Sequence, residues 1–540
     1  MFADAFATMF LREVSTGQKT GNPVRYAQIV ESFRDDEGKS RHRVLMSLGR
    51  VDAIDKEQIR RLITSLSRYL DTGKVPEGGR LGEVRDFGIA FVAEAIWREL
   101  LLHQFFARQL RKRKFDIAIE RAIFAMVAHR LVDPGSKRAC AEWIQHDAWL
   151  PNTRGLRSQQ LYRAMDFLDE CHADVEKALY QHRRTLFDRV SVVYFDTTST
   201  YFDCDETGDA DEAYGLRQRG HSRDLRPDRR QIVVGLATDQ NGVPIVSEVF
   251  SGETNDSLTV VPMLARLKEL GLTNVVWVTD RGMASEANRA TIAAAGLHSI
   301  VGARLRANET LRAAISADEQ PYVKAAEGLM VKELVVEGQR RVVCFSPESA
   351  ERDHALRNAA IERLKPVLER VNRGCDASEI TTNGWYNRLA SRNKDGTFSL
   401  DKNKLERESQ CDGTFVLDVS DDTISAADAA VAYKGLLRVE RCFHALKNTL
   451  DIRPVYHRLD QRIRAHVTLC VLALLVERVI ELRTGKSFDQ VAKIFARVRA
   501  AELLFDEQRV WETSALPPEA KKLLTAMRLE APPRVLPNSP

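Results

Sequence analysis

The chain is poor in the features that mark secreted, zinc-binding or membrane proteins. None of its eight cysteines forms a CxxC pair, which argues against a zinc site or a disulfide framework and favours a reducing compartment. The longest apolar run, VTLCVLALLV at residues 467–476, is too short to span a bilayer. The N-terminal MFADAFATMFLREV lacks the charged start and long apolar core of a signal peptide. We therefore expect a soluble cytoplasmic protein.

An excess of one charge is also missing. The 80 basic residues nearly balance the 76 acidic residues, so the net charge of +4 does not by itself indicate a nucleic-acid partner. We find no internal repeat. A chain of 540 residues with 44% hydrophobic content exceeds what one core usually serves, so we expect two to four domains.

The hydrophobic period changes several times along the chain. Residues 24–34 and 41–49 alternate as strands around the turn-rich DDEGKS, whereas residues 83–186 repeat at helical spacing. Strand patterns return at 191–196, 231–238, 243–250 and 274–280, with Asn241-Gly242 as a hairpin signal between the second and third. Residues 300–430 contain both strand and helix patterns. Long helices follow, and the Pro-rich APPRVLPNSP predicts a disordered tail.

Two of these predicted strands end on bare carboxylates. Asp196 follows VVYF and precedes a Thr-rich segment, and Asp280 follows NVVWVT. A charge at the end of a buried strand is costly unless it is paired or binds a metal. Each aspartate has a local alternative role. Asp280 could cap the short turn at RGM, and Asp196 could cap a turn through the threonines. We expect that Thr-rich turn to shape the rim of a site.

A third carboxylate lies on a later predicted helix, YKGLLRVERCFHALK. Tyr433, Glu440 and Lys447 recur at seven-residue steps and therefore share one face, with His444 one turn past Glu440. A solvated stripe with a salt-bridged glutamate is the alternative. If Asp196, Asp280 and Glu440 converge, they supply the oxygen ligands that Mg²⁺ prefers, and paired ions support phosphoryl transfer on a nucleic acid.

These motifs resemble a known family. VVYFDTTSTYF, VVWVTDRGMAS and YKGLLRVERCFHALK are similar to the segments that carry the Asp-Asp-Glu (DDE) triad in transposases of bacterial insertion sequences, in the branch with a Tyr-Arg-Glu-Lys signature. VLMSLGR, DPGSK, SGETND and RPVYHR also resemble segments of these transposases. One position departs, because Leu436 stands where the signature has arginine. Arg438 cannot simply replace that arginine, since two residues turn a helix by about 200°.

The resemblance implies a fold and a domain order. It implies an α/β catalytic core that is ribonuclease-H-like, with three antiparallel strands and then parallel strands with helices, an all-helical N-terminal domain and a β-rich insertion domain. We expect residues 1–80 to form a hairpin and helix, 81–190 a helical DNA-binding domain, 191–300 and 431–485 the two parts of the core, 301–430 the insertion, and 486–540 a helical segment with a disordered tail.

The resemblance also implies a mechanism. Asp196 would bridge two Mg²⁺ ions, Asp280 and Glu440 would each complete one ligand sphere, and Mn²⁺ would substitute for Mg²⁺. Activated water would cut DNA at the element end, and the freed 3′-hydroxyl would attack target DNA. The expected partners are the terminal inverted repeats, target DNA and a second copy of the chain in a synaptic homodimer. His444 is expected to be a neighbour of the site and not a catalyst.

Several basic residues are predicted to contact DNA. GLRQRGHSRDLRPDRRQ is dense in arginine, and the helix end ARQLRKRKF clusters basic residues, although solvated surface is the alternative for both. The predicted DNA-binding residues are Tyr433, Lys447, Arg281, Arg223, Arg229, Arg230, Lys112 and Arg113. In the insertion, Trp385 is a candidate for stacking on a flipped base, by resemblance to related transposases.

We therefore predict a DNA transposase, a metal-dependent endonuclease and strand transferase. A catalytically silent DNA-binding descendant is the alternative. A phosphatase with a nucleophilic aspartate after the first strand is disfavoured, because it expects a second aspartate where this chain has Thr198.

Overall fold

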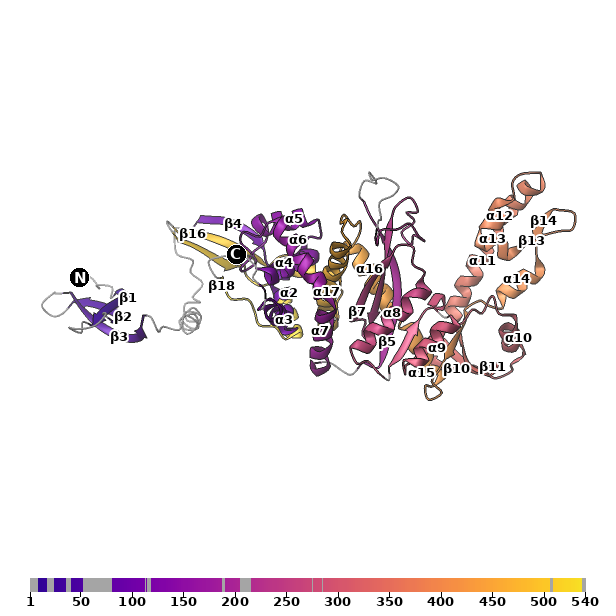
Figure 1. The fold of residues 1–540 in the computed structure, drawn as a ribbon, viewed down its shortest axis with the longest axis horizontal. Coiled ribbons are helices and arrows are strands. Elements are labelled where there is room, and N and C mark those ends of the chain that lie inside the picture. Colours follow the sequence, from indigo (N-terminus) through magenta and orange to yellow (C-terminus); the bar gives the residue numbers. More distant parts are fainter. Residues whose placement is uncertain are drawn as a thin grey trace. The chain divides into compact units, whose positions relative to one another are not determined.

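The computed structural model describes residues 8–16, 24–34, 40–51, 80–111, 113, 118–186, 190–203, 215–273, 275–283, 285–505 and 508–536. The chain divides into two compact units, Met1–Arg80 and Leu81–Pro540, and each is described by itself (Figure 1). The predicted helix before residue 80 and the predicted DNA contact Lys112 lie outside the described residues.

The first unit contains an antiparallel sheet of order β1-β2-β3. Strands β2 (Val24–Arg34) and β3 (Ser40–Arg50) confirm the predicted hairpin, and β1 (Thr8–Thr16) adds a third strand on the other side of β2. Ala27 and Val30 of the central strand are buried. The central strand β2 therefore supplies buried apolar side chains to this small unit.

The second unit begins with β4 (Arg80–Asp86) and a helical region, as the helical spacing predicts. Its helices are α2 (Gly88–Glu99), α3 (Leu102–Leu110), α4 (Ile119–Val132), α5 (Lys137–His146), α6 (Ser158–Glu170) and α7 (His172–Leu186). Helix α4 is buried on almost every side, including at the polar residues Arg121, His129 and Arg130. Ser136 caps α5 by accepting a hydrogen bond from the Ala139 amide.

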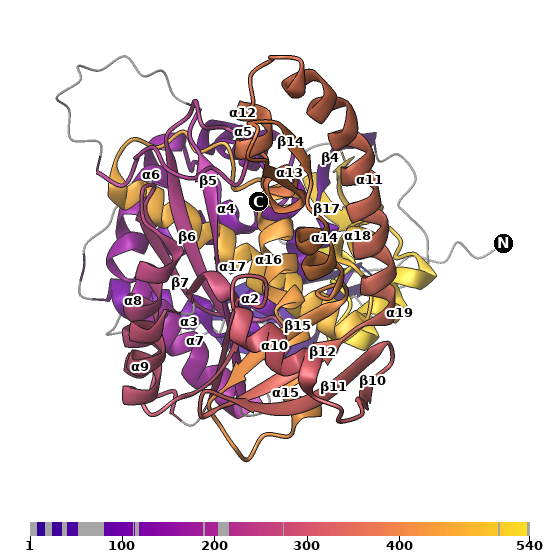
Figure 2. The ribbon, with the colours of Figure 1, turned by 90° about the vertical axis from the view of Figure 1, so that its right-hand side faces the viewer.

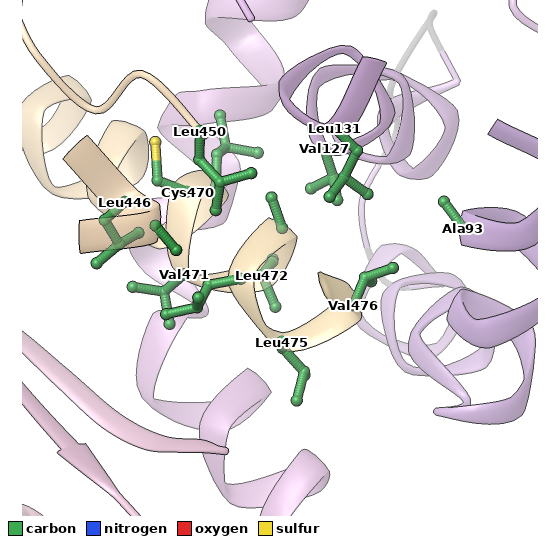
Figure 3. Packing of buried hydrophobic residues seen from close by; sticks show 14 of the residues in the cluster. Ala93, Val127, Leu131, Leu446, Leu450, Cys470, Val471, Leu472, Leu475 and Val476 are labelled. Carbon is green, nitrogen blue, oxygen red and sulfur yellow. The ribbon is translucent and has the colours of Figure 1, made fainter. Parts of the chain in front are cut away.

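Helix α17 (Asp460–Thr484) joins the helical region to the rest of the unit. It contacts α4 and α6 as well as the sheet strand β7 (Pro244–Ser251) and helix α16 (Leu437–Asn448). Figure 3 shows Leu472 and Val476 of α17 near Val127 and Leu131 of α4. The apolar run in α17 is therefore a core helix. In the part of the chain that the structure describes, no helix is long and apolar enough to cross a membrane.

A nine-stranded sheet of order β10-β11-β12-β15-β9-β8-β5-β6-β7 forms the centre of the second unit. Strands β5 (Val192–Tyr201), β6 (Gln231–Thr238) and β7 are antiparallel, whereas β8 (Val276–Thr279) and β9 (His298–Gly302) run parallel to β5. Helices α8 (Asp256–Glu269) and α9 (Glu286–Ala294) and the short η1 (Arg281–Met283) connect these strands. This is the strand order of the expected ribonuclease-H-like core.

The two faces of this part of the sheet bury different helices. Val193 and Phe195 of β5 belong to the apolar cluster that includes α8, whereas Tyr194 belongs to the cluster that includes α16 and α17. Alternate residues of β5 thus point to opposite layers. Both faces are covered, so β6 is buried along its whole length and reads as a continuous apolar run.

The segment after β9 extends the same sheet. Strand β15 (Thr414–Val419) pairs with β9, and β12 (Gln339–Phe345), β11 (Leu329–Val336) and β10 (Val323–Ala326) follow, all antiparallel (Figure 2). Helix α10 (Glu309–Ala317) precedes these strands. The remainder has its own small apolar core and consists of α11 (Pro347–Asn372), α12 (Ser378–Thr382), α13 (Gly384–Leu389), β13 (Ala390–Arg392), β14 (Phe398–Leu400) and α14 (Lys402–Ser409).

The C-terminal part is less helical than the sequence suggests. After α18 (Phe488–Phe495), strands β16 (Arg499–Phe505), β17 (Gln508–Thr513) and β18 (Val535–Leu536) form a sheet with β4, and α19 (Pro518–Met527) lies between the last two in sequence. The tail was predicted to be disordered, but Val535 and Leu536 form β18, whose backbone pairs with β17.

The packing of α17 generates a stability prediction. Leu474 is fully buried and Leu482, on the same helix, is 46% exposed. Leu474→Ala should lower the free energy of unfolding by about 2–5 kcal/mol through lost burial and a cavity. Leu482→Ala, the matched control, should change it by less than about 0.5 kcal/mol. Thermal denaturation of the full chain checks this, and equal effects would contradict the assignment of α17 to the core.

Candidate active site

Two aspartates lie side by side because their strands are adjacent and parallel. In the register of β5 with β8, Phe195 is opposite Thr279, so Asp196 and Asp280 are the next residues of the two strands. The Thr279 hydroxyl donates a 3.1 Å hydrogen bond to the Phe195 carbonyl and ties the strand ends together. Asp196 alternates with Phe195 and therefore points to the layer of Tyr194, which α16 covers.

The Thr-rich segment after Asp196 is a strand and not the predicted turn. Strand β5 pairs with β6 from Tyr194 to Tyr201, beyond the point where its pairing with β8 ends at Phe195. Threonine is β-branched and favours extended backbone, and the β6 ladder supplies partners along its whole length. Asp196 thus lies inside a strand, at the place where the neighbouring strand stops.

The helix predicted to carry Tyr433, Glu440 and Lys447 is two helices. Helix α15 (Ala426–Lys434) ends before Gly435, and α16 begins at Leu437. A Cβ on Gly435 would lie 2.0 Å from the Tyr194 hydroxyl, so only glycine allows this approach to β5. Hydrogen bonds of the tighter i to i+3 kind, such as Arg438 N to Gly435 O at 2.9 Å, carry the chain across the break.

Tyr433 nevertheless reaches the site. Its hydroxyl donates a 3.1 Å hydrogen bond to Asp280 Oδ1, and its ring stacks on Phe415 with centroids 5.7 Å apart. A Cβ on Gly302, at the end of β9, would lie 2.5 Å from that hydroxyl. Burial and the Asp280 charge raise the pKa of Tyr433, so the phenol remains a hydrogen-bond donor.

The charge of Asp280 influences the pKa of both Asp196 and Glu440. The pKa of Asp196 is raised to about 6, first by burial and then by the charges of Asp280 and Asp256, which together outweigh the lowering effect of the Thr197 amide and Arg223. The pKa of Glu440, on α16, is also raised, first by burial and then by Asp280. Such a group of like charges is stabilised by cations.

The donor set fits hard divalent cations. Carboxylate oxygens are the ligands that Mg²⁺ and Mn²⁺ take, and Mg²⁺ is usually held by one or two carboxylates with waters or phosphates. Among the described residues, no group of three His, Cys, Asp or Glu side chains is close enough to hold one ion. Pairs of these carboxylates, completed by phosphate oxygens and water, match the arrangement better than a cage made only of protein.

A fourth carboxylate, Asp256, was missed by the sequence analysis. Its Oδ1 accepts a 2.7 Å hydrogen bond from the Thr197 hydroxyl, and its Oδ2 forms a 2.6 Å ion pair with Arg223. Arg223 also donates to the Thr197 hydroxyl at 2.9 Å. The residue stands in SGETND and opens α8, so its sequence signal was that of a helix N-terminus. The predicted DNA contact Arg223 thus lies within the site.

The predicted contact Lys447 is paired with a carboxylate. Its Nζ donates to Asp224 Oδ1 at 2.8 Å, and Arg453 donates to the same oxygen. The Asp224 side chain is only 3% exposed. Burial lowers the pKa of Lys447, while Asp224 raises it. This buried cluster connects the arginine-rich loop to the end of α16.

The other predicted DNA-binding residues are distributed over η1, the arginine-rich loop and the helical region. Arg281 is exposed in η1, beside Asp280, and its charge lowers the pKa of Tyr433. Arg229 pairs with Asp203 at 3.4 Å and with Asp228 at 3.5 Å, and Arg230 is half-buried in the same loop. Arg113 belongs to the helical region, where it pairs with Glu170 at 2.5 Å.

Four further residues that the sequence singled out lie as follows. Leu436, at the signature arginine position, is buried in the core, and Arg438 instead donates to the Tyr194 hydroxyl at 3.2 Å. His444 is exposed on α16. Trp385 is half-buried against the small core of the insertion, with the Arg388 guanidinium 4.4 Å above its ring.

Comparisons with known proteins agree with this geometry. Residues 193–476 match the transposase DDE domain, and residues 11–77 match the N-terminal domain of the IS1634 family of transposases. No curated protein matches the chain.

Similar solved structures include a piggyBac transposase synaptic complex with hairpin DNA, at 9% identity, with 77% of this chain and 82% of that chain covered and a TM-score of 0.35. They also include a Mos1 transposase paired-end complex, at 12% identity, with coverages of 36% and 65%, and a pre-cleavage Mos1 transpososome, at 10% identity, with coverages of 46% and 78%. Both have a TM-score of 0.15.

The raised pKa of Asp196 predicts how stability depends on pH. The folded pKa of about 6 exceeds the ordinary 3.8, so the folded state binds more protons between these values and stability falls as pH rises through them. Asp196→Asn should therefore raise the free energy of unfolding of the metal-free chain by roughly 1–3 kcal/mol at pH 7.5, and the gain should vanish near pH 4.

Thermal denaturation at the two pH values checks this prediction. Mg²⁺ should raise the melting temperature of the wild type more than that of Asp196→Asn. Equal melting temperatures of the two metal-free proteins at pH 7.5 would contradict the half-buried, charged state of Asp196.

The Tyr433 hydrogen bond gives a second prediction. Tyr433→Phe removes the donor that orients Asp280 and should weaken Mn²⁺ binding by about 10–100-fold without unfolding the chain. Tyr322→Phe, in the insertion, is the matched control. Calorimetric titration with Mn²⁺ checks this, and unchanged affinity in Tyr433→Phe would show that the hydroxyl does not support a metal ligand.

Proposed function

The chain belongs to the transposase DDE domain family, and we propose that Asp196, Asp280 and Glu440 form its catalytic centre. Members of this family are enzymes that cleave DNA and transfer strands, and they depend on divalent metal ions. The protein is thus a DNA transposase with a ribonuclease-H-like core. The observation that carries the residue assignment is the parallel register of β5 with β8, which makes Asp196 and Asp280 neighbours. Glu440 is assigned to the same centre because the Asp280 charge contributes, after burial, to its raised pKa.

The three carboxylates would hold two Mg²⁺ ions, or Mn²⁺ in their place. Asp196 would contact both ions, while Asp280 and Glu440 would each hold one. When bound, a pair of such ions activates a water or a 3′-hydroxyl and stabilises the leaving oxygen. Tyr433 supports this arrangement by fixing the orientation of Asp280, and Arg223 balances the carboxylate charge on the side of Asp256.

Basic residues around the carboxylates would hold the DNA backbone. Arg281 is exposed beside Asp280 and is available for a phosphate. Lys447 would exchange its contact with Asp224 for a phosphate or hold the arginine-rich loop in place. The loop residues Arg223, Arg229 and Arg230 would follow the backbone away from the cut, and Lys112 and Arg113 would contact DNA from the helical region.

The substrate would be the two ends of an insertion sequence in the cytoplasm, followed by target DNA. Two copies of the chain would bring the terminal inverted repeats together. A catalytically silent descendant is the second candidate, and the observation that favours it is Leu436, whose buried side chain leaves the signature position without a phosphate contact.

A cleavage assay tests the proposal. Wild-type protein with Mg²⁺ should nick a duplex that carries the element's own end, and Asp196→Ala, Asp280→Ala and Glu440→Ala should each reduce the rate at least about 1,000-fold, since removing one ligand disrupts a transition state that depends on both ions. Asp422→Ala, an exposed carboxylate in the insertion, is the control.

DNA binding by each variant, measured without metal, should remain. If all three single variants were as active as the wild type, the residue assignment would be overturned. A wild type that binds the end and never cuts it would favour the silent descendant.

A further inference from the structure

The arginine-rich loop presents an apolar side chain to solvent. Leu225 is 87% exposed, the highest value of any large apolar residue that the structure describes. Its backbone has a φ of 56°, in the left-handed region that asparagine and glycine occupy far more readily than leucine. An exposed and strained leucine is unfavourable for folding, so its position calls for a role outside the folded chain.

Contacts on both sides hold Leu225 at the tip. On one side the Arg223 amide donates to Ser199 Oγ at 2.9 Å, and Asp224 is buried between Lys447 and Arg453. On the other side the Arg226 amide donates to Ser222 Oγ at 3.0 Å, and the Arg226 guanidinium lies over the Tyr201 ring at 5.2 Å. The loop is therefore anchored while its tip projects.

The tip lies close to the proposed catalytic centre. Arg223, two residues before Leu225, contacts Thr197, the residue after Asp196. Two residues span at most about 7 Å of backbone, so the leucine side chain is within reach of a DNA strand that enters the carboxylate site.

The surroundings of Leu225 fit DNA better than a protein partner. Residues 215–230 contain six arginines and two aspartates, and Lys447 and Arg453 add two more cations at the base of the loop. An apolar tip within a basic loop matches proteins that contact phosphates with arginine and insert an apolar wedge between base steps.

We propose that Leu225 is a wedge that enters the base stack of the element end beside the cleaved phosphodiester and opens the adjacent base pair. This inference rests on the proposed function, because it needs DNA at the carboxylate site. The arginines hold the backbone while the leucine occupies the space between the separated bases. The strained backbone keeps the side chain directed outward before DNA arrives.

Substrate rescue tests the wedge. On a fully paired element end, Leu225→Ala should cut at least about 10-fold more slowly than the wild type, because unstacking a step is no longer compensated. On the same end with a mismatch at the base pair beside the cut, the two proteins should cut at similar rates. Leu356→Ala, an exposed leucine on α11, is the control and should match the wild type on both substrates.

A second variant separates the side chain from the backbone. Leu225→Asn removes the apolar tip but suits a left-handed backbone, so it should fold at least as stably and show the same substrate-dependent defect. Equal slowing of Leu225→Ala on both duplexes, or no slowing on the paired one, would overturn the wedge.

Base opening can be measured without cleavage. Fluorescence of 2-aminopurine beside the cut site should rise on binding of the wild type and not on binding of Leu225→Asn. If the wild type cuts neither duplex, the proposed function fails, and this fluorescence change still decides the wedge. An equal rise with both proteins would refute it.

Discussion

The placement of two carboxylates, Asp196 and Asp280, at adjacent strand positions is the constraint on which the rest of the site depends. Parallel pairing of β5 with β8 forces the two carboxylates to be neighbours. Burial then raises the pKa of Asp196, so the folded chain carries an unfavourable charge at neutral pH. The structure surrounds this pair with groups that lessen the cost: Tyr433 donates to Asp280, and Arg223 lowers the pKa of Asp196. Divalent cations bound at this pair would complete the compensation.

Several packing features serve to bring α16 over this pair. Gly435 allows the chain to pass against Tyr194 of β5, and Gly302 leaves room for the Tyr433 hydroxyl at the end of β9. Helix α17 packs against α16 and also against α4 and α6, so it connects α16 to the helical region. The insertion lies between Asp280 and Glu440 in sequence, yet its strands extend the sheet through β9. A long interruption in sequence thus leaves the geometry of the core intact.

The sequence predicted the apolar strands that lead to Asp196 and Asp280, because short apolar runs followed by a charge are strong local signals, but it ended the first strand too early. It also predicted that Tyr433 and Glu440 approach one site. It did not predict the break at Gly435, where the chain passes so close to Tyr194 of a distant strand that a Cβ has no room. Strand β5 continues through the threonines because β6 pairs with them, which is likewise a tertiary effect.

Asp224 and Asp256 were missed for the same reason. Asp224 stands in a loop of arginines and reads as a solvated charge, yet it is buried against Lys447 and Arg453. Asp256 reads as the start of a helix, yet it meets Arg223 and Thr197. The environments of both aspartates depend on partners that are distant in sequence, so local spacing could not predict them.

The central claim is that Asp196, Asp280 and Glu440 bind the metal ions. The most direct measurement replaces Mg²⁺ with Fe²⁺ and maps where locally generated hydroxyl radicals cut the polypeptide. The account predicts cuts near residues 196, 280 and 440, lost together in Asp196→Asn. Cuts at other positions, or a pattern unchanged by that substitution, would contradict it.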